Sequence, residues 1–227
     1  MRNLAFALAR GTQGLSLLCL GAHPDDIEIG CGGTVLSLLA DHPGSVCRWV
    51  VFSASEERAR EARDGARRFL SAAGGRQVDI HDFRDGHFPT SLSGIKDALE
   101  HVKRECVPDL IFTHCRDDRH QDHRTVSDVT WQTFRDHLIL EYEVPKYDGD
   151  LGQPNFYVPL GPDAQRQKIE HLLAAFASQR DKKWFTRETF LALLRLRGVE
   201  CAAPDGYAEA FHGRKLVLGQ HPAGADR

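Results

Sequence analysis

The chain has 227 residues, 41% of them hydrophobic, and a formal net charge of −3 at pH 7. A chain of this length can bury one substantial core, and its nearly balanced charge gives no general attraction to nucleic acid or to an acidic membrane. No apolar segment is long enough to cross a bilayer, and the apolar run within residues 1–10 is too short for the core of a signal peptide. We therefore expect a cytoplasmic protein without a membrane anchor.

Apolar strands and amphipathic helices alternate through the first two thirds of the chain. Strands are expected at residues 15–20, 46–52, 77–83 and 108–113. Helices are expected at 34–40, 56–72, 94–105 and 126–137, with Ser93 as the cap of the third. This alternation predicts parallel strands joined by right-handed crossovers, and so an α/β fold: a Rossmann-like three-layer sandwich with a mostly parallel sheet.

The last third is less regular. A strand is expected at residues 138–144, and helices at 163–178 and at 187–197, the latter ended by Gly198. Residues 146–162 are rich in Gly, Pro and Asp, which favours a loop with a short extended piece at 155–159. The sequence contains no internal repeat and no low-complexity linker. We therefore expect residues 1–227 to form a single domain.

A histidine and two carboxylates, His23, Asp25 and Asp26, follow the first predicted strand directly. In open α/β sheets, ligands bind in the crevice beyond the carboxyl ends of the strands. His23 and Asp26 are three residues apart and close enough to hold one ion. The glycines at residues 30–33 do not form a dinucleotide-binding G-x-G-x-x-G motif, because they follow the acidic turn rather than open it.

A second polar cluster follows the strand at 108–113. It contains His114, Asp117, Asp118, His120, Asp122 and His123. A catalytic zinc ion takes three protein ligands of the His or Asp type and leaves one position for water. One histidine of this cluster can complete the set begun by His23 and Asp26. Spacing alone leaves His114, His120 and His123 as candidates for that ligand.

The neighbours of these histidines are expected to have structural roles. Asp117 and Asp118 are expected to be solvated or paired with Arg116 and Arg119. The six cysteines include no C-x-x-C pair, and they are interpreted as small buried hydrophobes in a reducing compartment. Cys115 could act as a nucleophile, but no base is marked as its partner.

The pairing of AHPDD at residues 22–26 with HQDH at 120–123 resembles the LmbE-like, or PIG-L, family of zinc-dependent N-deacetylases. Members of that family remove acetyl groups from N-acetylglucosamine-type conjugates. Weaker similarities extend over residues 15–215 in the family's order: segments 30–34, 58–70, 83–88 and 206–211. The chain departs from the family pattern at Ile27, where many members have a glutamate directly after the two aspartates.

The resemblance implies that His23, Asp26 and His123 hold a zinc ion. A His₂Asp set also suits iron(II), so Fe²⁺ is the alternative cofactor. Bound zinc can activate a water molecule and polarise an amide carbonyl. The cofactor expected from the sequence is therefore Zn²⁺.

The same resemblance implies Asp25 as the general base that takes the proton of water. His120, when protonated, would assist the oxyanion or the departing amine. Asp122 is expected to orient His120, as carboxylates commonly orient imidazoles near a metal.

Substrate contacts are expected from three further residues. The resemblance implies that Arg58 and Asp85 contact sugar hydroxyls, although an arginine on a helix is usually solvated. His114 is interpreted either as a substrate-facing residue or as a structural one behind the ligands. Glu209 is expected to be functional or to form a buried ion pair.

The expected function is that of a metal-dependent hydrolase that removes an N-acetyl group from an N-acetylglucosamine-type sugar conjugate. One alternative is a metal-dependent hydrolase of another amide or ester. The other is a non-catalytic sugar-binding protein of the same fold, which would be expected to lack Asp25 or a ligand. A soluble small-molecule glycoconjugate is the expected partner, without nucleic acid, and a homo-oligomer is compatible with the sequence. The loops at 82–88 and 146–162 are expected to determine the substrate.

Overall fold

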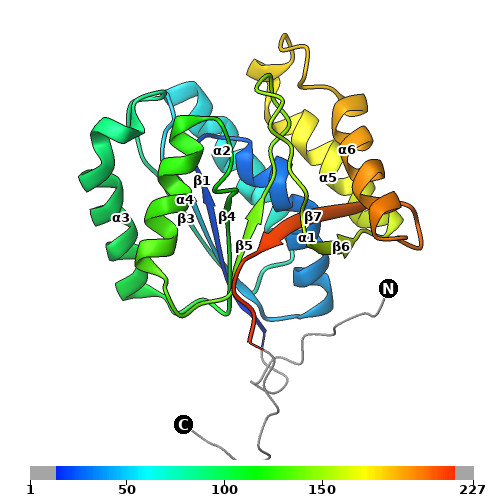
Figure 1. Cartoon of the computed structure of the whole chain (residues 1–227), viewed down its shortest axis with the longest axis horizontal. Helices are drawn as coiled ribbons and strands as arrows, with labels where there is room; N and C mark the ends of the chain where they lie inside the picture. The colour runs from blue at the N-terminus through cyan, green and yellow to red at the C-terminus, as the bar shows by residue number, and fades with distance from the viewer. Residues whose placement is uncertain (1–13, 218–227) are drawn as a thin grey trace, which may run out of the picture.

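The computed structural model describes residues 14–217 and is built on a seven-stranded sheet in that region (Figure 1). The strand order is β3-β2-β1-β4-β5-β7-β6. The strands are β1 (Ser16–Gly21), β2 (Val46–Val51), β3 (Gly75–Ile80), β4 (Leu110–His114), β5 (Ile139–Tyr142), β6 (Phe156–Pro159) and β7 (Ala208–Gly213). Strands β1 to β5 are parallel, whereas β7 runs antiparallel to both β5 and β6.

Helices cover both faces of this sheet (Figure 1). They are α1 (Asp26–Asp41), α2 (Glu56–Phe69), α3 (Leu92–Glu105), α4 (Gln121–Thr133), α5 (Pro162–Ala175) and α6 (Arg187–Glu200), with 3₁₀ turns at Phe88–Ser91 and Ala177–Gln179. Helices α1, α2 and α5 contact one another on one face, and α3 contacts α4 on the other. The predicted Rossmann-like three-layer fold with a mostly parallel sheet is confirmed.

Strand β1 lies in the middle of the five parallel strands and contributes side chains to both hydrophobic cores. Its alternate side chains point to opposite faces, so that Leu17 and Cys19 join the core under α1, while Leu18 and Leu20 join the core under α3 and α4. A central strand buried on both faces has the continuous apolar sequence that predicted it.

The first helix starts earlier than expected. It begins at Asp26 rather than at residue 34 and runs through the glycines at 30–33. These glycines allow close packing: a Cβ at Gly30 would lie 2.1 Å from the Tyr142 ring, and one at Gly32 would lie 2.4 Å from Phe69. Tertiary packing therefore outweighs the low helix propensity of glycine here.

Helix α4 also begins earlier, at Gln121 instead of residue 126, with His120 as its amino-terminal cap. The third helix begins at Leu92 after a 3₁₀ turn, and its cap is Ser91 rather than Ser93. Helix α6 continues through Gly198 to Glu200. Strand β7 was not expected, and it inserts between β5 and β6.

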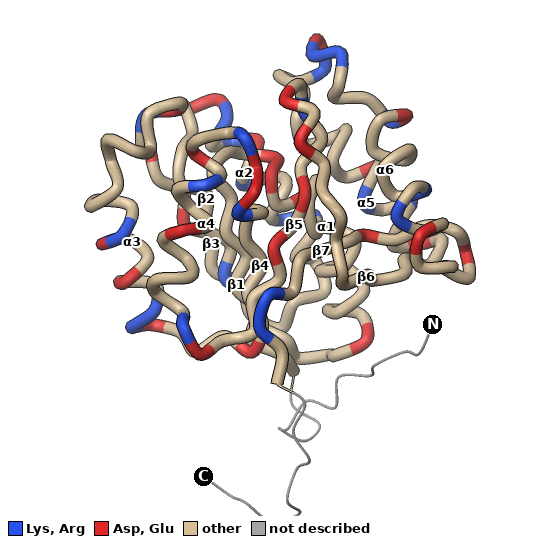
Figure 2. The backbone as a smooth tube through the Cα atoms, viewed as in Figure 1, with Lys and Arg blue, Asp and Glu red and all other residues tan. Residues whose placement is uncertain are grey.

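Basic and acidic positions are interspersed along the described chain (Figure 2), in keeping with the small net charge. Within residues 14–217, no helix is long and apolar enough to cross a membrane. The amino-terminal run on which the signal-peptide expectation rests lies outside the described residues.

Candidate metal centre and its cleft

The two polar clusters meet because the strands that precede them are neighbours in the sheet. Strand β1 pairs with β4, so the loop after β1 and the start of α4 lie at the same end of the sheet. They border a cleft of about 560 Å³. Its lining includes His23, Asp25, Asp26, His120 and His123 together with Arg58 and Asp85. The structure thus brings together seven of the nine side chains proposed from the sequence.

Asp26 lies at the centre of the candidate metal site and is 3% exposed. Its Oδ2 atom is 3.4 Å from His23 Nδ1, and its Oδ1 atom is 3.5 Å from His123 Nε2. Two ligand atoms bound tetrahedrally at about 2.0–2.1 Å from a zinc ion are about 3.4 Å apart. Each histidine therefore lies at a distance from Asp26 that suits two ligands of one zinc ion.

In both histidines, the ring nitrogen that points away from Asp26, here called the outer nitrogen, faces a carboxylate. His123 donates from Nδ1 to Asp118 Oδ2 over 2.8 Å. His23 Nε2 lies 3.2 Å from Asp122 Oδ2 and 3.0 Å from Asp85 Oδ1. A proton held on each outer nitrogen leaves the lone pair of the inner nitrogen directed toward Asp26, which is the usual arrangement of metal-binding histidines.

The charge around His23 favours a cation. Burial lowers the pKa of this imidazole, but hydrogen bonds to Asp122, Asp26 and Asp85 outweigh burial and raise the pKa well above its ordinary value. A metal ion bound at His23 would take the place of that proton, because a histidine ligand must be neutral.

Asp122 is held in place by two backbone N–H groups, from Gly86 at 2.7 Å and from Phe88 at 3.1 Å. The sequence predicts that Asp122 orients His120, but its carboxylate contacts His23 instead. Only the backbone N–H of Asp122 reaches His120, donating to Nδ1 over 3.3 Å. The reason is that His120 caps α4, so its ring turns toward the backbone of the first helical turn.

His114 is fully buried and lies behind the ligands, not on the cleft wall. Its Nε2 accepts the backbone N–H of Ala22 over 2.9 Å, so this lone pair holds the loop that carries His23. A residue without exposed surface cannot contact a substrate, which supports the structural interpretation of His114.

Three sets of three donor atoms lie within 4.8 Å of one another in the described chain: His23, His120 and His123; Asp26, His114 and His123; and His23, Asp85 and Asp122. Asp26 links the first two sets, since its two oxygens face His23 and His123. The Nε2 atom of His114 accepts the backbone N–H of Ala22, and the Nδ1 atom of His120 accepts that of Asp122. The set implied by the family resemblance, His23, Asp26 and His123, is not one of these three groups, although Asp26 faces both histidines.

Asp25 caps α1 and is 5% exposed. Its backbone has a φ of 95°, a left-handed conformation that costs a non-glycine residue about 1–3 kcal/mol. Burial raises the pKa of its carboxyl to about 7, although the neighbouring Arg58 guanidinium opposes the shift. A carboxylate that titrates near neutral pH beside a metal site is suited to general-base chemistry.

Arg58 and Asp85 both lie at the cleft, but they differ in availability. The Arg58 guanidinium lies 3.1 Å from Asp25, pairs with Glu61 over 2.7 Å and donates to the Pro24 carbonyl. The N–H groups of this guanidinium are therefore used mainly by acceptors of the protein itself. The Asp85 side chain is 75% exposed and can meet a substrate.

His120 lines the cleft beside the ligands, with its ring centroid 5.0 Å from that of His23 and 4.6 Å from that of His123. Burial lowers its pKa, and the nearby His23 charge adds to this effect. Because Nδ1 accepts a backbone N–H, the neutral ring carries its proton on Nε2. His120 is therefore a hydrogen-bond donor even when uncharged.

Asp118 was expected to be solvated or paired with arginine, but it is 4% exposed and contacts His123. It also accepts the His120 backbone N–H over 2.7 Å and pairs with Lys146 over 3.0 Å. These donors hold the pKa of its carboxyl well below its usual range, although burial alone would raise it. The sequence does not indicate this contact between Asp118 and His123, because their spacing follows no metal motif.

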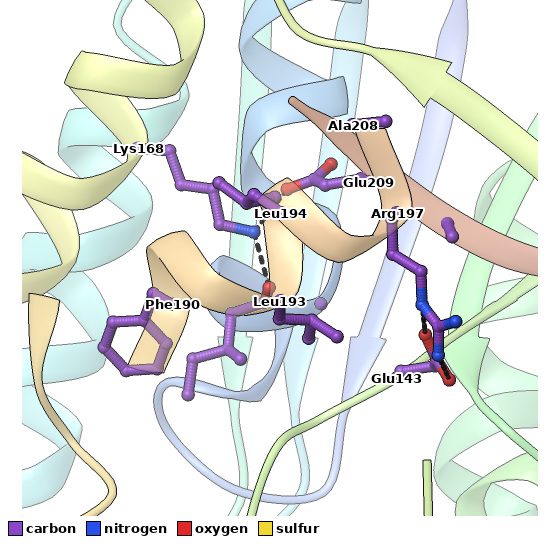
Figure 3. A pocket seen from close by; sticks show the side chains of 11 residues that line it. Glu143, Lys168, Phe190, Leu193, Leu194, Arg197, Ala208 and Glu209 are labelled. Atoms are coloured by element: carbon purple, nitrogen blue, oxygen red, sulfur yellow. Dashed lines mark hydrogen bonds and ion pairs between the residues drawn. The ribbon is translucent and has the colours of Figure 1, made fainter. Parts of the chain in front are cut away.

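Glu209 lies away from the metal site and forms the buried ion pair that was the second expectation for it. It pairs with Lys168, and its oxygens accept the N–H groups of Gly33 at 2.8 Å and Thr34 at 2.7 Å. Figure 3 shows Lys168 and Glu209 beside an interior pocket between α5, α6 and β7. Through these hydrogen bonds, Glu209 links β7 to the middle of α1.

Comparison with known proteins gives a match to the family described as PIG-L: GlcNAc-PI de-N-acetylase over residues 18–134, just over half of the chain. YaiS of Escherichia coli (strain K12), described as an uncharacterized deacetylase, is 29% identical over an aligned length of 147 residues, and the match covers 61% of this chain and 78% of YaiS.

Solved structures show the shared fold. The N,N'-diacetylchitobiose deacetylase of Pyrococcus horikoshii has a TM-score of 0.67 at 20% identity, covering 87% of this chain and 82% of its own. The 4-carboxy-2-hydroxymuconate hydratase GalB of Pseudomonas putida KT2440 has a TM-score of 0.68 at 16% identity, covering 92% and 100%. The fold thus occurs with more than one reaction.

The family match rests on the sequence of this chain and not on its fold alone. It extends from β1 to the end of α4 and includes both loops that form the candidate metal centre. The chain belongs to the PIG-L family of metal-dependent de-N-acetylases.

Proposed function

We propose that the cleft hydrolyses the acetamide of an N-acetylglucosamine-type sugar conjugate and releases acetate and a free amine. The observation that carries this proposal is the paired orientation of His23 and His123. Each ring gives its outer nitrogen to a carboxylate and directs its inner nitrogen toward Asp26, with Asp25 adjacent.

His23, Asp26 and His123 would hold a zinc ion, and the donor set would also accept iron(II). When bound, such an ion supplies an acidified water and a Lewis acid for the amide carbonyl. Asp122 and Asp118 keep the two imidazoles in the tautomer that this binding requires.

Asp25 accepts a proton from the attacking water as the new C–O bond forms. Arg58 keeps this carboxylate in place at the cleft surface. The same proton is then available to the nitrogen as the C–N bond breaks, so that the amine leaves uncharged. His120 donates from Nε2 to the developing oxyanion.

The sugar itself would lie between the metal site and the rim of the cleft. Asp85 offers an exposed acceptor for hydroxyl groups, and Tyr147 and Trp184 offer aromatic faces on the lining. We propose a soluble glycoconjugate of the cytoplasm as the substrate and the whole chain as one catalytic domain.

The test is the release of acetate and amine from a panel of N-acetylglucosamine conjugates by zinc-loaded protein, with iron(II)-loaded protein in parallel. Equal amounts of both products from the wild type, and none from Asp25→Asn, are expected. Metal-loaded protein that releases no acetate from the panel would overturn the proposal and direct attention to other amides, to esters or to hydration.

A further inference from the structure

Lys146 is a nearly buried cation in the loop between β5 and β6. Its side chain is 10% exposed, and its Nζ lies 3.0 Å from Asp118 Oδ2 and 2.6 Å from Asp150 Oδ2. Both carboxylates are themselves buried, with side chains 4% and 6% exposed. A single ammonium group therefore balances two buried negative charges.

The Asp118 oxygen that faces Lys146 also accepts the Nδ1 proton of His123 over 2.8 Å. The other oxygen accepts the backbone N–H of His120 over 2.7 Å. Three donors thus fix this carboxylate. Among these three, Lys146 is the one that carries a permanent charge at neutral pH. The position of the His123 ring depends on that of Asp118.

The loop that carries Lys146 is itself anchored at both ends. Glu143 pairs with Arg197 over 2.7 Å and accepts the backbone N–H of Gly152 over 3.0 Å (Figure 3 shows the Glu143–Arg197 pair). Between these ends, Lys146 lines the same cleft as His123. The loop therefore connects one wall of the cleft with a candidate metal ligand.

Removal of the Lys146 ammonium would leave Asp118 and Asp150 as buried charges without their cation. An uncompensated buried charge is strongly unfavourable, and it is relieved by movement, hydration or protonation of the carboxylate. Each of these changes weakens the hold of Asp118 on His123. Loss of such an outer partner typically lowers metal affinity about 10–100-fold.

We propose that Lys146 is a positioning residue that acts through Asp118 to hold His123 in its metal-binding orientation. The inference rests on the proposed function only for the presence of a metal. It predicts metal affinity and does not depend on which substrate is hydrolysed.

The test is a double-mutant cycle of zinc dissociation constants, measured by competition with a chromophoric chelator. Lys146→Met is expected to weaken zinc binding about 10–100-fold. In an Asp118→Asn background, the same change is expected to alter the constant by less than about twofold, because coupled residues are not additive. Lys183→Met removes an exposed lysine and serves as the matched control for charge.

Wild-type zinc affinity in Lys146→Met, or an equal loss in both backgrounds, would overturn the inference. Circular dichroism establishes that each variant is folded. If Lys146→Met does not fold, Lys146→Gln keeps a neutral donor and carries the same cycle. Tight zinc binding without acetate release would refute the proposed reaction and leave this inference standing.

Discussion

The carboxylate of Asp25 lies 3.1 Å from the guanidinium of Arg58, at the point where the backbone of Asp25 adopts a left-handed conformation. Arg58 belongs to α2, and it also donates to the Pro24 carbonyl in the same loop. Two contacts thus hold a strained segment, and the resulting position of Asp25 beside the ligands is one that local sequence preferences disfavour.

Asp25→Asn is expected to keep zinc and to lose turnover by at least about 10²-fold, because the amide cannot accept a proton. Steady-state acetate release and zinc content per chain measure the two effects. Asp97→Asn, at an exposed site on α3, is the control. Turnover within a few-fold of the wild type would remove Asp25 as the base.

Asp122→Asn separates two possible roles of this carboxylate. Because Asp122 contacts His23, we expect zinc affinity to fall about 10–100-fold. Chelator competition measures this, with Asp128→Asn, an exposed position on the same helix, as the control. Normal zinc affinity with reduced turnover would instead indicate that Asp122 orients His120.

His123→Ala and His120→Ala should differ in kind. The first removes a proposed ligand, so zinc is expected to be lost during dialysis against a weak chelator. The second should retain zinc and lose turnover, because only the oxyanion donor is removed. Metal analysis after dialysis distinguishes them, and the reverse pattern would make His120 the third ligand.

Lys168→Met is expected to lower the free energy of unfolding by about 3–5 kcal/mol, because it leaves the buried Glu209 without its cation. Urea denaturation of the metal-free protein gives this value. Lys183→Met, at an exposed position, should change it by less than about 0.5 kcal/mol. A loss below about 1 kcal/mol in Lys168→Met would show that the pair contributes little to stability.

Cys115 should be unreactive in the native protein. Burial raises the pKa of its thiol to about 11, so the thiolate that reacts with iodoacetamide is scarce at pH 8 and increases as the pH approaches 11. Peptide mass spectrometry after brief alkylation at a series of pH values measures this. Rapid labelling at pH 8, or loss of turnover in Cys115→Ser, would revive the nucleophile hypothesis.

The parallel half of the fold was predictable because its strands are continuous apolar segments. Residues 15–20 and 108–113 match β1 and β4 within one or two positions. Their adjacency, which brings the two clusters together, follows from the topology of such sheets. Strand β7 was not predictable, because its short sequence becomes a strand only through pairing with β5 and β6.

Partners within the site depend on orientation, which residue spacing does not determine. Asp122 was recognised as a partner of histidine, but its placement in the first turn of α4 directs it to His23. The role of Asp118 depends on a loop 28 residues away that supplies Lys146. Such long-range contacts have no local pattern in the sequence.

The contact of Glu209 with α1 has a consequence for synthesis of the protein. A chain emerges from the ribosome with its amino terminus first, so α1 is made well before β7. Until Glu209 emerges, the N–H groups of Gly33 and Thr34 lack this acceptor and Lys168 lacks this counter-charge. The contacts that join α1, α5 and β7 therefore form only after all three segments have been synthesised, and α1 lacks these contacts in any shorter nascent chain.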